Sequence, residues 1–229
     1  MELPSEIAVM TLPKAILFPQ AMLPLYIFEP RYRQMLTDSL NSHRMFSVAM
    51  QKPGRTREIP SSVAGLGLIR ASVGNRDGSS LLILQGIARV QLAEIVRYRP
   101  YRVQRIRPLE TTSGDSVAVD ALTAKVLELV AERLEQGLEL PVQVLKQLRQ
   151  ESPPDEGELS SVLSLKQVIK YLAKLENADH LADLVSCTLL REATERQTIL
   201  ETSNLEDRLK QLIHFLMVEI RRHRNRKKS

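Results

Sequence analysis

The sequence predicts an α+β protein in which a β-rich half precedes a helical half. Residues 1–110 contain short apolar runs separated by prolines, glycines and polar turns, a pattern typical of strands. Residues 116–229 instead place apolar side chains at the three- and four-residue spacing of amphipathic helices. The formal net charge also changes along the chain, from +7 over residues 1–110 to −8 over 111–220 and +6 over 221–229. This asymmetry favours a division into two domains, 1–110 and 116–229.

The β-rich half is expected to form a compact barrel or sandwich of six or so short strands. Its prolines argue against long helices and favour edge strands and turns. Two glycines two residues apart, Gly65 and Gly67, indicate a bulge or a close approach of another backbone. The expected strands cover residues 7–10, 23–28, 45–50, 63–69, 81–84, 90–93 and 101–106.

One helix is expected inside this half, over residues 31–40, because Pro30 fits the first turn of a helix. Its apolar side chains share one face, which should be buried. These are Tyr32, Met35, Leu36 and Leu40. The residues outside that face are Arg31, Arg33, Gln34 and Asp38.

A polar linker at residues 111–115 should separate the two halves. Helices are then expected over 117–134, 142–148, 159–175, 178–188 and 190–200. The last helix follows a capping-box pattern at 203–206 and carries a long apolar stripe. The stripe consists of Leu205, Leu209, Leu212, Ile213, Leu216 and Ile220, and the helix ends in a basic tail at 221–228.

No catalytic, metal-binding or cofactor-binding pattern can be assembled from the sequence. None of the nine glycines is followed by Lys, which excludes a P-loop, and neither a dinucleotide-binding glycine fingerprint nor a Gly-x-Ser-x-Gly elbow occurs. The four histidines have no partners at zinc-site spacing. Ser161 and Ser164 lie near Lys166, so spacing leaves a Ser–Lys pair open, although such residues recur on any solvated helix. We therefore expect a non-enzyme without metal or cofactor.

The N-terminus and the distribution of apolar residues predict a compartment. The N-terminus has two acidic residues and no basic region, and no apolar stretch approaches the roughly 18 residues of a membrane span, so we expect a cytoplasmic chain outside membranes. Cys187 is the only cysteine, which excludes an intrachain disulfide. A lone cysteine in an apolar helix is more typical of a small buried hydrophobe than of a reactive thiol.

Two basic segments raise the question of polyanion binding. Residues 97–107 contain five arginines and two tyrosines, so phosphate contacts and base stacking are conceivable, with Arg99, Arg102 and Arg105 as the candidates. The alternative is an edge strand whose arginines block edge pairing. The tail at 221–228 either binds a polyanion or is a solvated helix end whose cations oppose the helix dipole.

The order and wording of several motifs resemble the Lon N-terminal domain family. The opening runs at 12–13, 17–19 and 23–32 (Leu-Pro, Leu-Phe-Pro, and Leu-Pro-Leu-Tyr-Ile-Phe-Glu-Pro-Arg-Tyr) resemble the beginning of that domain. Later motifs at 67–69, 84–90, 181–184, 197–201 and 205–209 look like its later strands and helices, so the resemblance spans about residues 7–220. It implies a PUA-like pseudo-barrel followed by a helical bundle, in a stand-alone form without the family's ATPase and protease domains.

The resemblance also implies a function. The chain is expected to bind unfolded or tagged polypeptides, as an adaptor or holdase-like factor in protein quality control, with an ATP-dependent protease as a further candidate partner. Phe28 is the candidate apolar anchor, with Arg31, Arg33 and Gln34 facing solvent; Phe28 as a core residue is the alternative. RNA binding through the PUA-like barrel and residues 97–107 is the other hypothesis, although fold likeness alone is a weak argument for it.

Overall fold

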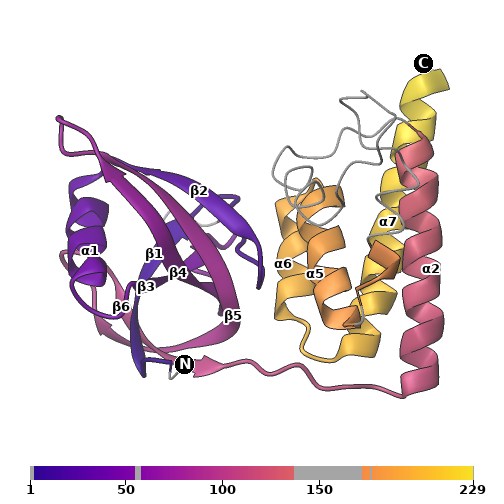
Figure 1. Cartoon of the computed structure of the whole chain (residues 1–229), viewed down its shortest axis with the longest axis horizontal. Helices are drawn as coiled ribbons and strands as arrows, with labels where there is room; N and C mark the ends of the chain where they lie inside the picture. Colours follow the sequence, from indigo (N-terminus) through magenta and orange to yellow (C-terminus); the bar gives the residue numbers. More distant parts are fainter. Residues whose placement is uncertain (1–2, 55–57, 137–171, 176, 229) are drawn as a thin grey trace, which may run out of the picture. The chain divides into compact units, whose positions relative to one another are not determined.

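The computed structural model of the 229-residue chain describes residues 3–54, 58–136, 172–175 and 177–228 (Figure 1). The chain folds into two units, Met1–Glu110 and Thr111–Ser229. Within the described residues the first unit holds one mixed sheet and one helix, and the second is helical. The α+β fold class expected from the sequence is therefore confirmed.

Six strands form the sheet of the first unit, in the order β2-β5-β4-β3-β1-β6, and a further pairing between β5 and β6 closes it. Only the β1–β3 pair is parallel. The beginning of β5 pairs with β2 and its end pairs with β6, so the sheet curls into a barrel and β2 lies at an edge (Figure 1). The strands are β1 (Glu6–Leu12), β2 (Met22–Ile27), β3 (Met45–Met50), β4 (Val63–Gly74), β5 (Ser80–Arg97) and β6 (Val103–Pro108).

The strands expected at 81–84 and 90–93 are one continuous strand, β5, which corrects the sequence interpretation. Gly86, the expected break, lies inside it and is paired with Gly67 of β4, next to a shift in register. A glycine in the middle of a strand permits a sharp bend without ending the ladder. Gly86 therefore bends β5 between its β2-paired and β6-paired parts, instead of separating two strands.

The barrel contains two clusters of buried side chains. The first includes Met10, Phe46 and Leu84 and is covered by helix α1 (Pro30–Leu40), which contributes Tyr32 and Met35. The second lies among β1, β3, β4, β5 and β6 and consists of Ile7, Val9, Met45, Ala49, Ala64, Leu66, Val90 and Ile106. Because both faces of β3 meet a cluster, every residue of β3 is buried. The expected face of α1 is buried as well, apart from half-buried Leu40.

The segment before β2 packs against Gly65 of β4 and Gly86 of β5, which have no side chains. Leu17 and Phe18 are each 1% exposed. A Cβ atom placed on Gly65 would lie 1.9 Å from the carbonyl oxygen of Leu17, and one placed on Gly86 would lie 2.0 Å from that of Phe18. Only glycine therefore permits this approach. The expected close approach at Gly65 is confirmed, and its partner is the backbone at residue 17.

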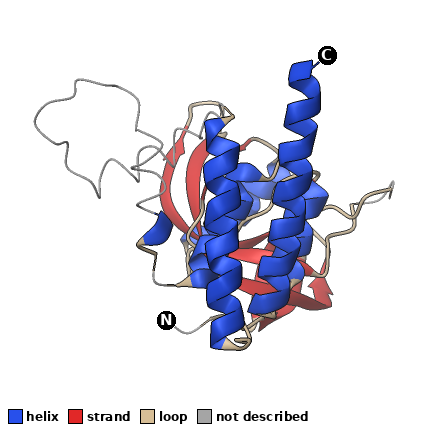
Figure 2. Cartoon of the chain, turned by 90° about the vertical axis from the view of Figure 1, so that its right-hand side faces the viewer, coloured by secondary structure: helices blue, strands red, loops and turns tan. Residues whose placement is uncertain are grey.

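The second unit contains the described helices α2 (Ser116–Glu135), α5 (Ala178–Leu189), α6 (Ala193–Glu201) and α7 (Leu205–Lys228). Helices α2 and α7 run side by side in Figures 1 and 2, and their C-terminal ends meet where His223 Nε2 lies 3.1 Å from the Gln136 carbonyl oxygen. The stripe of α7 is buried except for half-buried Ile213. The helix expected at 142–148 and nearly all of 159–175 lie outside the described residues.

Arg208, which is fully buried, joins three parts of this unit. Its Nε donates to the Thr202 carbonyl oxygen at 2.8 Å, and its Nη1 forms an ion pair with Asp179 at the start of α5. Thr111 donates to the same carboxylate at 2.9 Å, and Thr112 pairs with Asn204 as an isolated bridge. The beginning of the expected linker is thus fastened to the helical unit. The cap of α7 is also shifted by one residue, because Asn204 Oδ1 accepts from Asp207 N.

We predict that Gly86→Ala lowers the free energy of unfolding by about 3 kcal/mol, because the new methyl group would overlap the Phe18 carbonyl oxygen. Gly74→Ala is the matched control, since Gly74 ends the neighbouring strand and a methyl group there would have nothing within 4 Å. It should change the free energy by less than about 1 kcal/mol. Urea unfolding measures both, and coincident midpoints for the two variants would contradict the prediction.

Candidate functional site

The outer surface of β2 exposes apolar side chains at alternate positions. Met22, Pro24 and Tyr26 face outward, while Leu23 and Leu25 pack toward the first core cluster. Phe28, directly after β2, continues the outward row. Phe28 is 60% exposed and Tyr26 52%, and their rings stack with centroids 5.7 Å apart. Phe28 is therefore not a core residue, which excludes that alternative from the sequence analysis.

The neighbouring strands extend this row into a continuous surface. Tyr26 of β2 is paired with Leu81 of β5, and Leu81 is paired with Val73 of β4. Two residues along, Pro24 is paired with Ile83. All of these side chains are at least partly exposed, and residues directly opposite in a ladder are in contact range. We call this surface the apolar face; it consists of Met22, Pro24, Tyr26, Phe28, Val73, Leu81 and Ile83.

Contiguous apolar surface of this kind marks binding sites more often than isolated exposed residues do. Of the residues of the apolar face, only Phe28 is predicted from the sequence as part of a binding surface. The run at 23–28 is apolar at every position, so alternation cannot show which side chains point outward. Leu81 and Ile83 join Tyr26 and Pro24 only through the pairing of β2 with β5, which no local pattern reveals.

The start of α1 borders the apolar face with polar groups. Arg31 donates to Glu29 Oε2 at 2.9 Å and to Glu58 Oε2 at 2.7 Å, so its guanidinium is held in ion pairs. Arg33 is exposed and lies over Gly78 in the β4–β5 turn. Gln34 donates to Asp38 Oδ1 at 2.8 Å. Of the four candidate peptide-binding residues, Phe28, Arg33 and Gln34 are thus exposed, while Arg31 is half-buried and ion-paired. Besides the hydrogen bonds from Ser79, the charge of Arg33 helps to lower the pKa of Asp77.

The three candidate polyanion-binding arginines do not form one free basic surface. Arg102 donates to the Glu58 carbonyl oxygen at 3.1 Å and lies over the Tyr98 ring. Arg105 pairs with Glu94 at 2.9 Å and with Glu6 at 3.5 Å. Arg99 is exposed. The edge-strand interpretation of this segment is also wrong, because β6 pairs with β1 on one side and β5 on the other.

The basic tail of α7 is partly neutralised by acidic residues of its own unit. Arg222 Nη1 lies 2.9 Å from Glu219 Oε1 and 3.4 Å from Glu195 Oε1. Arg224 pairs with Glu132 of α2 at 2.6 Å. These contacts tie the end of α7 to its neighbours, so the described part of the tail is not wholly available to a polyanion.

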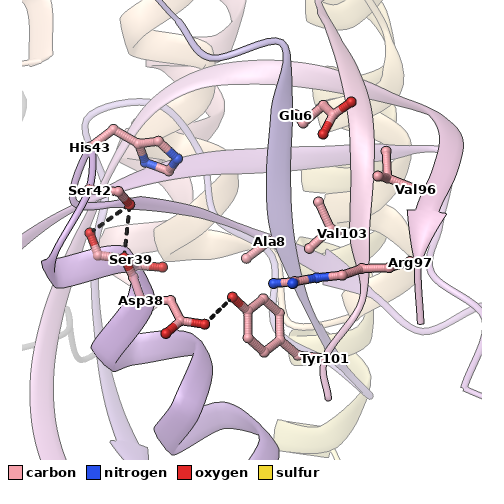
Figure 3. Close-up of a pocket in the computed structure, with 10 residues that line it drawn as sticks. All are labelled: Glu6, Ala8, Asp38, Ser39, Ser42, His43, Val96, Arg97, Tyr101 and Val103. Carbon is pink, nitrogen blue, oxygen red and sulfur yellow. Dashed lines mark hydrogen bonds between the residues drawn. The ribbon is translucent and has the colours of Figure 1, made fainter. Parts of the chain in front are cut away.

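A cavity of about 310 Å³ lies in the first unit between the end of α1 and the ends of β1, β5 and β6 (Figure 3). The Tyr101 hydroxyl donates to Asp38 Oδ2 at 2.5 Å, and Arg97 lies over the Tyr101 ring. Burial, together with this hydrogen bond, raises the pKa of Tyr101 to about 12. The hydrogen bond from Tyr101 also lowers the pKa of Asp38.

The cavity shows no arrangement for nucleophilic catalysis among its described lining residues. Ser42 Oγ donates to the Asp38 and Ser39 carbonyl oxygens, so its proton is directed to the helix backbone (Figure 3). His43 Nδ1 accepts from the Met45 backbone N–H at 3.1 Å, and burial lowers the pKa of this imidazole. The Ser42 hydroxyl and the imidazole are thus committed to the backbone, unlike a nucleophile–base pair.

The described residues also contain no metal site, no membrane-spanning helix and no reactive thiol. They contain no group of three His, Cys, Asp or Glu side chains that could hold a metal ion. Within the same residues, no helix has the length and apolar character needed to cross a membrane. Burial raises the pKa of the Cys187 thiol to about 12, and its Sγ donates to the Leu184 carbonyl oxygen. Ser161, Ser164 and Lys166 lie outside the described part of the chain.

Comparison with known proteins relates this chain to one family and to one part of its members. The family model described as the ATP-dependent protease La (LON) substrate-binding domain matches residues 6–218. Lon protease 2 of Myxococcus xanthus is 24% identical over 223 residues, which cover 94% of this chain and 24% of the relative. The Lon protease of Dictyoglomus thermophilum is 19% identical over 222 residues, covering 96% and 25%. The chain therefore spans about a quarter of the length of these relatives.

Solved structures show the same fold. The N-terminal domain of a Mycobacterium avium complex Lon protease superposes with a TM-score of 0.65 at 16% identity, covering 93% of this chain and 98% of that one. A Lon N-terminal domain protein from Xanthomonas campestris gives a TM-score of 0.58, also at 16% identity, covering 93% and 99%. The whole described architecture, barrel and helices, therefore has counterparts of matching extent.

We predict that stability falls as the pH rises from 10 to 12. Burial raises the pKa of both Tyr32 and Tyr101 to about 12. An unfolded tyrosine ionises near pH 10, so between these values only the unfolded chain loses the proton, which favours unfolding. Each tyrosine should contribute roughly 2 kcal/mol to the loss. Tyr101→Phe should remove about half of it, as measured by urea unfolding across this range.

The control is Tyr98→Phe, because Tyr98 is 63% exposed. This variant should follow the wild-type pH profile. Titration of tyrosinate absorbance on the folded chain gives an independent measurement. Ionisation of Tyr101 near pH 10 in the folded state would contradict the proposed burial and its hydrogen bond to Asp38.

Proposed function

The chain belongs to the ATP-dependent protease La (LON) substrate-binding domain family, and we propose that it binds unfolded polypeptide segments on the apolar face of β2, β5 and β4. Membership supports a role in substrate recognition. The observation that carries the proposal is the stacked pair Tyr26 and Phe28, exposed beside Leu81 and Val73. Exposed aromatic side chains supply large contact area and are enriched where proteins bind one another.

The chemistry of the face suits a segment that has lost its own core. Apolar side chains of an unfolded chain would cover Tyr26, Phe28 and Leu81, and removal of this surface from water favours binding. Exposed Arg33 and the ion-paired Arg31 would form a charged rim, with Gln34 beside them. Rim charges contribute to orientation and association rate more than to affinity.

We further propose that the chain acts without catalysis, as an adaptor or holdase-like factor in protein quality control. Its match to the Lon relatives covers their substrate-binding domain, and an ATP-dependent protease is the partner that this relationship suggests. A PUA-like assignment of the barrel and a cytoplasmic location also stay predictions. The presence of only one cysteine is in keeping with a reducing compartment.

RNA binding through residues 97–107 is the less favoured function. Arg102 is bonded to the Glu58 carbonyl oxygen and Arg105 to two carboxylates, so binding phosphate would require these contacts to be exchanged. The RNA-binding hypothesis would be supported by a salt-dependent mobility shift with single-stranded RNA that is weakened by Arg99→Gln, Arg102→Gln and Arg105→Gln. Absence of a shift at low salt would remove it.

We predict that the double variant Tyr26→Ser, Phe28→Ser weakens binding of a permanently unfolded client, such as reduced and carboxymethylated lactalbumin, by at least about 10-fold. Burying an aromatic side chain of this size is worth roughly 1.5–3 kcal/mol, and both rings are exposed in the free chain. Fluorescence anisotropy with labelled client measures the affinity. Because neither ring is in the core, the urea midpoint should stay near the wild-type value.

The matched control is Val117→Ser, which removes an apolar side chain that is even more exposed, at 73%, and lies outside the apolar face. It should bind the client as the wild type does. Equal binding by the double variant and the wild type would place the binding surface elsewhere. Absence of client binding by the wild-type chain would overturn the proposed function itself.

A further inference from the structure

A second cavity, of about 130 Å³, lies in the helical unit where the end of α2, the connection between α5 and α6, and α7 come together. Nearly all of its lining is charged. The lining residues are Arg133, Arg191, Glu192, Glu219, Arg222 and His223. It shares no residue with the apolar face or with the cavity at Tyr101, and the proposed polypeptide binding does not use it.

Arg133 is the unusual member of this group. It is 1% exposed, and its Nε and Nη1 atoms are buried without a hydrogen-bond partner in the described structure. Burial lowers the pKa of this guanidinium, and the neighbouring charge of Arg191 acts in the same direction, whereas the negative charge of Glu219 acts to raise it. A buried cation whose donors are unused is costly, because it has lost its hydration without replacement. Arg133 therefore lines the cavity with a guanidinium that has two unused donors.

The acidic residues around the cavity do not use these donors. Glu219 Oε1 accepts from Arg222 Nη1 at 2.9 Å, and the same Arg222 atom lies 3.4 Å from Glu195 Oε1. Glu192 and its sequence neighbour Arg191 both line the cavity and are exposed. The remaining group, His223, directs Nε2 to the Gln136 carbonyl oxygen. The Glu219 carboxylate is thus already shared with Arg222, while Arg133 and Arg191 line the cavity together.

We infer that this cavity is a binding site for one small tetrahedral oxyanion of the inorganic phosphate type. Arginines reach it from three segments of the chain, and a tetrahedral oxyanion accepts hydrogen bonds from several directions, whereas a carboxylate offers two oxygens in one plane. The volume of about 130 Å³ is small, which suits a five-atom anion better than a ligand as large as a nucleotide.

Such an anion would join α2, the α5–α6 connection and α7 through one set of charge-assisted hydrogen bonds. Its binding would therefore stabilise the helical unit, because a ligand that binds only the folded chain raises the unfolding temperature by mass action. The stability of the helical half would then depend on the concentration of phosphate. This property is independent of the apolar face, so each proposal can fail alone.

The test is titration of the full chain with inorganic phosphate at constant ionic strength, followed by thermal unfolding and by phosphorus NMR line broadening. The expected result is a saturable shift of the unfolding temperature, roughly 4–7 °C at about 20 times the dissociation constant. Arg133→Met and Arg191→Gln should both abolish the shift and the broadening. Arg221→Gln is the matched control, an exposed arginine on α7 that does not line the cavity, and it should respond like the wild type.

A second measurement separates binding from a structural role for Arg133. Without phosphate, Arg133→Met should unfold at the same temperature as the wild type or higher, since it removes a buried charge with unused donors. A lower unfolding temperature would show that the native contacts already satisfy Arg133, which overturns the inference. An equal shift with chloride would also overturn the inference, because a general salt effect would then explain the stabilisation. Stabilisation of Arg133→Met or Arg191→Gln by phosphate would overturn it as well, because the cavity would then not be the phosphate site.

Discussion

The approach of the Leu17–Phe18 backbone to Gly65 and Gly86 is the constraint on which the barrel unit depends. Side chains at either glycine would collide with a carbonyl oxygen, so the segment before β2 can lie against the strands only at these positions. Gln20 N donates to the Gly86 carbonyl oxygen at 2.9 Å and Gly86 N donates to that of Ala21, also at 2.9 Å. These two hydrogen bonds lie directly before β2 and position its first residue, Met22, opposite Gln85 of β5.

The apolar face is a consequence of that placement. Once the start of β2 is fixed on β5, the two-residue period of the strand decides that Tyr26 points outward and Ile27 inward. A slip of one residue would bury Tyr26 and expose Ile27, because it turns each side chain to the opposite face. The glycine contacts in the interior and the exposed aromatic pair on the surface therefore both depend on the register in which β2 pairs with β5. Recognition of unfolded segments, as proposed, would depend on this register.

The helical unit is organised differently, by buried charge. Arg208 is bonded to carbonyl oxygens, Thr111 and Asp179, and joins parts of the chain distant in sequence. Arg133 is as deeply buried and lacks such a set of partners among the described residues. Both are arginines on long helices, and the sequence pattern does not distinguish them. They differ in the groups that the fold places opposite each guanidinium. Arg208 has acceptors within its own unit and stabilises the fold, whereas Arg133 has unused donors and is proposed to bind an anion.

The sequence by itself determined the fold class, the strands β1 to β4, helix α1 and most described helices, because proline positions and apolar periodicity act over short distances. The resemblance of its motifs indicated the family. Only the tertiary structure decided that Gly86 bends one strand, that β6 is paired on both sides, and that Phe28 joins residues of β4 and β5 on one surface. These features depend on pairings between segments far apart in sequence, whose energies no local pattern contains.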